Sequence, residues 1–137
     1  MKKILSACVL ASAVTLAALF ALSPRAEAGT RGGATMFIDT VGRMAQGTLA
    51  TVRKSADTFG YIGCKVIGTS TGSLTTTCTA RNTAGTVSVS CTSSSPQIAS
   101  AAAAINGDSF LRFYWNSSSQ CTQVEAENSS SFEPKLN

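Results

Sequence analysis

The sequence predicts a mainly β (α+β) fold, a small antiparallel sheet or sandwich of about six to seven short strands, with one short covering helix and two disulfides. Two observations carry this prediction. Between residues 61 and 91, apolar and polar residues alternate, which is the pattern of half-buried strands. The cysteines Cys64, Cys78, Cys91 and Cys121 follow an apolar leader, and an even cysteine count behind an export signal is typical of a disulfide framework.

Residues 1–28 have the pattern of a cleaved signal peptide. A basic start, an alanine-rich apolar run at residues 4–22 and the small residues Ala26 and Ala28 fit the composition of such a leader and its cleavage rule. We therefore expect an exported protein, extracellular or periplasmic, with no integral membrane segment after cleavage.

The remainder is long enough for one domain, residues 34–137, after a flexible lead-in at residues 29–33. The whole chain has a net charge of +4, and removal of the leader takes away three basic residues and one acidic residue, which leaves +2. This charge is small and scattered, whereas nucleic-acid binding needs clustered Lys and Arg. We expect no nucleic-acid partner and no cofactor.

The first elements expected in the domain are two β-rich stretches, Met36–Ile38 and Thr48–Arg53. They contain Phe, Ile, Thr and Val, which favour strands. Gly42 and Gly47 separate them, and residues 55–60 are expected to form a loop.

Three strands connected by short turns are expected next, at residues 61–67, 74–80 and 86–91. The turns, at residues 68–73 and 82–85, are rich in Gly, Ser, Thr and Asn, which turns favour. This arrangement is a three-stranded meander.

The registers of the two hairpins in this meander agree with each other. Folding the first hairpin about Thr71 sets Cys64 opposite Cys78, and folding the second about residues 84–85 sets Cys91 opposite Cys78. Both registers place the same residues on one face, as the period of two in a strand requires. The apolar face contains Ile62, Cys64, Val66, Leu74, Cys78, Ala80, Val87, Val89 and Cys91, and the opposite face contains Lys65, Thr75, Thr77, Thr79, Ser88 and Ser90.

A short helix is predicted at about residues 95–106. Ser95 suits the N-cap and Pro96 suits the first helical position. From Ile98, apolar residues recur at i, i+3, i+4 and i+7, and Gly107 is a stop signal. We expect the apolar stripe of this helix to cover the sheet.

The last predicted element is a hairpin of residues 110–116 and 121–128 around Ser118 and Ser119. Its outer face carries Tyr114, Arg112 and Gln123, which are the candidate binding-surface residues. On the core side we expect Trp115 to face Thr122, Phe113 to face Val124 and Leu111 to face Ala126, and on the outer side Arg112 to face Glu125.

Four cysteines permit three disulfide connectivities. Cys78 lies on the middle strand and reaches either neighbour, because directly opposed Cα atoms are close enough for a disulfide. We favour Cys64–Cys78 with Cys91–Cys121, since this pairing ties the helix and the last hairpin to the sheet. The alternative, Cys78–Cys91 with Cys64–Cys121, stays open.

Side chains that carry catalysis are scarce. The sequence has no histidine, which excludes Ser-His and Cys-His catalysis and imidazole metal sites. The cysteines are assigned to disulfides, so we expect no metal site and no catalytic residue. Glu125 and Glu127, at i and i+2, fall on one strand face, and glycoside hydrolysis needs two carboxylates. A carboxylate-dependent hydrolase is therefore an alternative.

Several segments carry a resemblance when they occur together: Tyr61–Cys64, Cys78–Arg81, Gly107–Trp115, Gln120–Thr122 and Ser131–Lys135. With these segments the chain resembles a group of small exported bacterial proteins of unassigned function. The resemblance covers most of the chain after the leader. It implies a secreted single domain and no activity, substrate or catalytic residue.

The sequence therefore predicts a secreted or cell-surface, non-enzymatic protein that acts by binding or assembly. The expected partner is an envelope or extracellular protein or a polysaccharide. Besides the hydrolase, a second alternative is a secreted inhibitor or toxin-like effector that presents residues 68–73 as a rigid loop, since preorganised loops bind with less loss of entropy.

Overall fold

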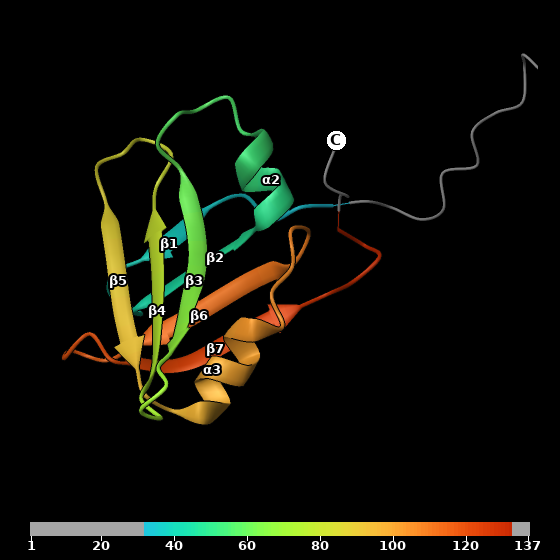
Figure 1. The fold of residues 1–137 in the computed structure, drawn as a ribbon. Coiled ribbons are helices and arrows are strands. Elements are labelled where there is room, and N and C mark those ends of the chain that lie inside the picture. Colours follow the sequence, from blue (N-terminus) through green and yellow to red (C-terminus); the bar gives the residue numbers. More distant parts are fainter. Residues whose placement is uncertain (1–31, 133–137) are drawn as a thin grey trace, which may run out of the picture.

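The computed structural model describes residues 32–132. The predicted signal peptide, residues 1–28, and most of the predicted lead-in lie outside the described residues. Residues 32–132 form seven strands in two antiparallel sheets, together with two helices (Figure 1). The mainly β fold class with a short covering helix and two disulfides is confirmed.

The first sheet, called sheet A, has four strands in the order β1-β2-β6-β7. They are β1 (Phe37–Asp39), β2 (Met44–Thr48), β6 (Phe110–Trp115) and β7 (Cys121–Glu127). Because β2 pairs with β6, the first and last strands of the described chain belong to one sheet.

The second sheet, called sheet B, is the predicted meander: β3 (Tyr61–Gly68), β4 (Leu74–Arg81) and β5 (Ser88–Ser93). Cys64 and Cys91 both lie opposite Cys78, so the predicted registers are confirmed.

The prediction of a β-rich stretch at Thr48–Arg53 is wrong. The chain leaves β2 at Thr48 and forms helix α2 (Leu49–Lys54). Leu, Ala, Arg and Lys favour helices, and basic residues in the last turn interact favourably with the helix dipole. Burial of Ala50 and Val52 adds the packing energy that a helix this short needs.

The predicted covering helix forms as α3 (Pro96–Ala103), shorter than the expected 95–106. Ser95 caps it, because its side chain accepts a hydrogen bond from the backbone N–H of Ile98. The helix ends with Ala104 as its C-cap, and in the turn that follows the backbone N–H of Asn106 donates to Ser109 Oγ, 2.7 Å away. The helix packs against β7, β4 and β3, along one open side of the sandwich (Figure 1).

The last hairpin has most of the predicted register. Leu111 lies opposite Ala126, Arg112 opposite Glu125 and Phe113 opposite Val124, but Trp115 lies opposite Cys121 rather than Thr122. The pairing shifts between Tyr114 and Trp115 because the turn fixes its own geometry. There, Asn116 N donates to Gln120 O at 3.0 Å, and Asn116 Oδ1 accepts from the backbone N–H groups of Ser118 and Gln120.

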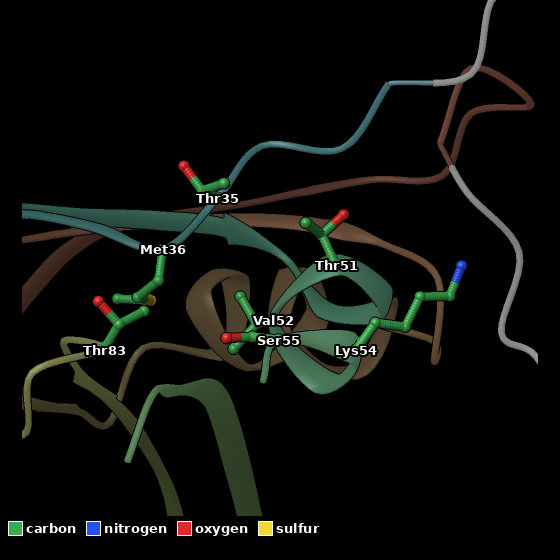
Figure 2. Close-up of a pocket in the computed structure, with 7 residues that line it drawn as sticks. All are labelled: Thr35, Met36, Thr51, Val52, Lys54, Ser55 and Thr83. Carbon is green, nitrogen blue, oxygen red and sulfur yellow. The ribbon is translucent and has the colours of Figure 1, made fainter. Parts of the chain in front are cut away.

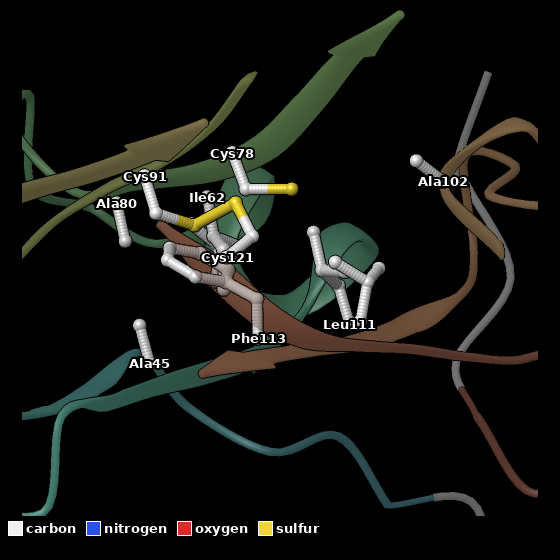
Figure 3. Packing of buried hydrophobic residues seen from close by; sticks show 11 residues of the cluster. Ala45, Ile62, Cys78, Ala80, Cys91, Ala102, Leu111, Phe113 and Cys121 are labelled. Carbon is white, nitrogen blue, oxygen red and sulfur yellow. A yellow bond between two sulfur atoms is a disulfide. The ribbon is translucent and has the colours of Figure 1, made fainter. Parts of the chain in front are cut away.

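The core lies between the two sheets (Figure 3). Leu111 and Phe113 of sheet A are 0% exposed and meet the cysteines and Ala80 of sheet B. Cys64–Cys78 joins neighbouring strands of sheet B, and Cys91–Cys121 joins sheet B to sheet A. The favoured disulfide connectivity is confirmed.

Candidate functional site

Each sheet turns its inner face to the core and leaves an outer face on the other side. Residues directly opposite each other in an antiparallel pair share a face, so the strand pairing identifies the members of each outer face. The accessible part of the outer face of sheet A consists of Phe37, Asp39, Met44, Gln46, Arg112, Tyr114, Gln123, Glu125 and Glu127.

The first row on this face crosses all four strands. Phe37 lies opposite Gln46, Gln46 opposite Arg112, and Arg112 opposite Glu125. Arg112 Nε donates to Gln46 Oε1 at 2.8 Å, and Arg112 Nη1 lies 3.2 Å from Glu125 Oε2. The guanidinium also lies 5.1 Å from the ring centroid of Phe110. Three side chains therefore hold the guanidinium in one orientation.

The second row lies beside the first and contains Asp39, Met44, Tyr114 and Gln123. Gln123 Nε2 donates a hydrogen bond to Glu125 Oε1, which links the two rows. The structure thus places the three sequence candidates Arg112, Tyr114 and Gln123 on one continuous surface.

Four members of this surface were missed from the sequence: Phe37, Asp39, Met44 and Gln46. Met44 and Gln46 lie in β2, a strand that the sequence does not predict. Its apolar-polar alternation, Met-Ala-Gln-Gly-Thr, is weak because alanine and glycine stand at its inward-facing positions. Phe37 belongs to a predicted strand but has no sequence signal that places it in line with Arg112. Its side chain is 51% exposed.

The far end of this face is covered by the ends of the described chain. Thr48 Oγ1 accepts a hydrogen bond from Ala34 N at 2.9 Å, and the Phe132 ring stacks on Phe110 with 5.9 Å between centroids. Thr48 is therefore 0% exposed although it belongs to the outer row. Apart from Glu127, which lies opposite Phe110 and is exposed, the accessible part of the face is limited to the two rows described above.

Glu125 and Glu127 lie on the same strand face, as predicted. Glu125 is engaged by both Arg112 and Gln123, and Glu127 is exposed. An engaged carboxylate of this kind positions its neighbours, whereas a glycosidase needs one carboxyl group to donate a proton and the other to act as a base or nucleophile.

The outer face of sheet B has a different chemistry. Thr75, Thr77, Thr79, Ser88 and Ser90 line it with hydroxyl groups. A shallow hollow of about 460 Å³ lies over β3 and β4, where Gly63 has no side chain. The hollow is lined by Gly63, Cys64, Lys65, Ile67, Thr77 and Thr79.

The turn that was predicted as a rigid loop, residues 68–73, is held by hydrogen bonds. Thr69 N donates to Ser73 O at 2.9 Å and Gly72 N donates to Thr69 O at 3.0 Å. Gly72 has a φ of 86°, which glycine adopts without strain. The turn projects into solvent at the end of sheet B.

A pocket of about 330 Å³ lies between the segment before β1, helix α2 and the turn between β4 and β5. Figure 2 shows Met36 and Thr83 close together on one side and the α2 residues on the other. The lining residues are Thr35, Met36, Thr51, Val52, Lys54, Ser55 and Thr83. No carboxylate or thiol lines it, so its walls suit a small apolar group rather than acid–base chemistry.

Within residues 32–132, no three His, Cys, Asp or Glu side chains gather as a metal site would require. In the same part of the chain, neither helix has the length and apolar character needed to cross a membrane.

Comparison of this chain with known proteins finds no matching family model, no matching curated protein and no matching solved structure.

Proposed function

We propose that this is an exported, non-enzymatic binding protein whose outer face of sheet A holds a neutral polysaccharide. The observation that carries the proposal is the row Phe37, Gln46, Arg112 and Glu125, with Tyr114 and Gln123 beside it. Its side chains are planar, come from all four strands and lie on an accessible face.

Planar side chains match the chemistry of sugars. An aromatic ring offers a flat apolar face to the C–H groups of a sugar ring, and the phenol of Tyr114 adds a hydrogen-bonding group. Amide, guanidinium and carboxylate groups have paired donors or acceptors that fit neighbouring hydroxyl groups. Because Gln46, Arg112 and Glu125 already hold one another, little side-chain entropy is lost when a ligand binds.

The charges on this face disfavour an acidic ligand, because Asp39 and Glu127 add negative charge to the Arg112–Glu125 pair. Arg112 is paired with Glu125, so an acidic polymer gains little attraction from it. A row that crosses four strands spans about 14 Å at the usual strand spacing. This length suits an extended polymer better than a single small molecule. Two disulfides also suit an oxidising compartment outside the cytoplasm, where such polymers occur.

The test is depletion of the oxidised protein from solution by insoluble neutral polysaccharides, with cellulose, chitin and starch granules as probes. Tyr114→Ala and Phe37→Ala should each weaken binding about tenfold, the loss that corresponds to about 1.4 kcal/mol of contact energy. The matched control is Thr77→Ala on the outer face of sheet B, which should bind like the unaltered protein. The proposal is wrong if no probe binds, or if all three variants bind equally well.

A further inference from the structure

We propose that two copies of this chain associate through the outer edge of β3, so that their three-stranded sheets join into one six-stranded sheet. In sheet B, β3 is a terminal strand and pairs with β4 on one side. The proposal concerns sheet B and is independent of the polysaccharide surface on sheet A.

The hydrogen-bond pattern shows which backbone groups of β3 face this edge. Thr69 N donates to Ser73 O at 2.9 Å, which continues the β3–β4 ladder as a hydrogen-bonded pair. Such pairs alternate with non-bonded pairs, so Cys64 and Cys78 form a non-bonded pair. Their Cα–Cα distance of 4.0 Å agrees. Cys64, and two residues later Val66, therefore direct their N–H and C=O groups away from β4.

Side chains on both faces of the second half of β3 are exposed, although α3 packs against part of this strand. Lys65 to Gly68 are all exposed, although Val66 and Ile67 are apolar. Val66 is 37% exposed and Ile67 is 43% exposed, and they point to opposite faces of the strand. Exposed edges are usually blocked by proline, bulges or several charges. This half of β3 has one charged residue, no proline and no bulge.

The opposite edge of sheet B is better protected. Thr92 N, on the outer side of β5, donates to Ser119 O at 3.1 Å, and Thr92 also forms a bridge with Gln120. The turn between β6 and β7 thus occupies one end of that edge. This difference points to β3, rather than β5, as the edge that pairs with another chain.

Among two-fold axes at Cys64, Lys65 and Val66, charge and exposure favour the axis at Val66 for two antiparallel β3 strands. An axis at Lys65 sets two like charges opposite each other, which is unfavourable. An axis at Cys64 pairs Ile62 with Val66 of the second copy, and Ile62 is only 8% exposed. An axis at Val66 pairs Val66 with its own copy and Lys65 with Ile67 of the second copy. The aliphatic stem of Lys65 then covers that isoleucine.

The expected association is weak and depends on concentration. One strand edge buries less surface than the roughly 1,200 Å² at the lower end of stable interfaces, so we expect a dissociation constant between about 1 μM and 1 mM. Sedimentation equilibrium of the oxidised chain over a concentration series measures it.

The sharpest variant is Val66→Pro. It removes an N–H group that faces the edge and leaves the β3–β4 ladder intact, because proline is tolerated where the N–H faces away from the sheet. The matched control is Ser90→Pro, which removes an outward N–H group of β5. We expect Val66→Pro to weaken association at least about tenfold, and Ser90→Pro to leave it unchanged.

A charge exchange tests the register without altering the backbone. Ile67→Lys sets a lysine opposite Lys65 of the second copy and should abolish the dimer. Adding Lys65→Glu to that variant replaces repulsion with attraction and should restore it. A wild-type chain that stays monomeric up to about 1 mM overturns the proposal, and so does a charge exchange that fails to restore the dimer in a folded variant.

Discussion

The two sheets of this protein are stabilised in different ways. The inner face of sheet A carries large, fully buried side chains such as Leu111 and Phe113, whereas the core residues of sheet B are smaller on average: Ile62, Cys64, Cys78, Ala80, Val89 and Cys91. Sheet A therefore contributes most of the apolar volume of the core. Sheet B contributes less apolar burial and is instead joined covalently, within itself and to sheet A.

The outer faces differ as well. Sheet A presents planar groups that hold one another, such as Arg112 and Glu125, whereas sheet B presents single hydroxyl groups such as Thr77 and Thr79. A hydroxyl rotates freely and bonds readily to water, but a fixed guanidinium or amide has a defined direction. The same strand alternation thus produces one preorganised surface and one general polar surface.

The largest expected effect compares what the side chains of sheet A and of sheet B contribute to the shared core. Phe113→Ala should lower the free energy of unfolding by about 3–5 kcal/mol, because it leaves a large cavity in a fully buried site. Val89→Ala in sheet B should lower it by about 1–2 kcal/mol, because that side chain is smaller and half-buried. Urea unfolding of both variants measures the difference. Equal losses would show that sheet B contributes as much packing as sheet A.

The second effect compares the disulfides. Cys91 and Cys121 are 30 residues apart, and replacing both with alanine should cost about 3–4 kcal/mol. Cys64 and Cys78 are 14 residues apart within one hairpin, and their replacement should cost about 3 kcal/mol or less. Denaturant unfolding of the two double variants gives both values. A larger loss for the Cys64–Cys78 pair would contradict the view that the link between the sheets matters more.

The third effect concerns the turns. Gly72 and Gly85 in sheet B have φ of 86° and 72°, and alanine at either position should cost about 1–2 kcal/mol. Gly85→Ala should cost more, since its Cβ would lie 2.9 Å from Phe59 Cγ, whereas nothing lies within 4 Å at Gly72.

Sheet A places Ser119 at a φ of 56°, so Ser119→Gly should stabilise the protein by up to about 1 kcal/mol. Thermal unfolding of the three turn variants compares them. A destabilised Ser119→Gly variant would show that the hydroxyl, and not the backbone, decides this turn.

The smallest expected effect concerns the ion pair between Arg112 and Glu125 in the first row of the outer face of sheet A. Glu125→Gln removes the charge opposite Arg112, and the two side chains are 37% and 33% exposed, so the loss of stability should be under about 1 kcal/mol. Unfolding at low and high salt should show a smaller difference at high salt, because screening weakens the pair in the unaltered protein. A salt-independent loss would assign the effect to hydrogen bonding alone.

Much of sheet B could be predicted from the sequence because its pairing is local. Short turns connect neighbouring strands, so the positions of Cys64, Cys78 and Cys91 are sufficient to align them. Sheet A was harder, because β2 pairs with β6 across more than half of the described chain. The helix at Leu49–Lys54 was missed because six residues give too short a periodic pattern, and burial of Ala50 and Val52 decides it.

The residues on the outer face of sheet A likewise fall into two groups, those that the sequence could predict and those that it could not. Arg112, Tyr114 and Gln123 belong to one hairpin, and strand alternation by itself determines that they share a face. Gln46 and Phe37 come from β2 and β1, and only the tertiary structure brings them into the same row. The physical reason is the separation along the sequence of the residues that interact. Alternation and short turns act between residues that are close in sequence, whereas the order of strands in sheet A depends on how apolar faces from distant segments bury one another.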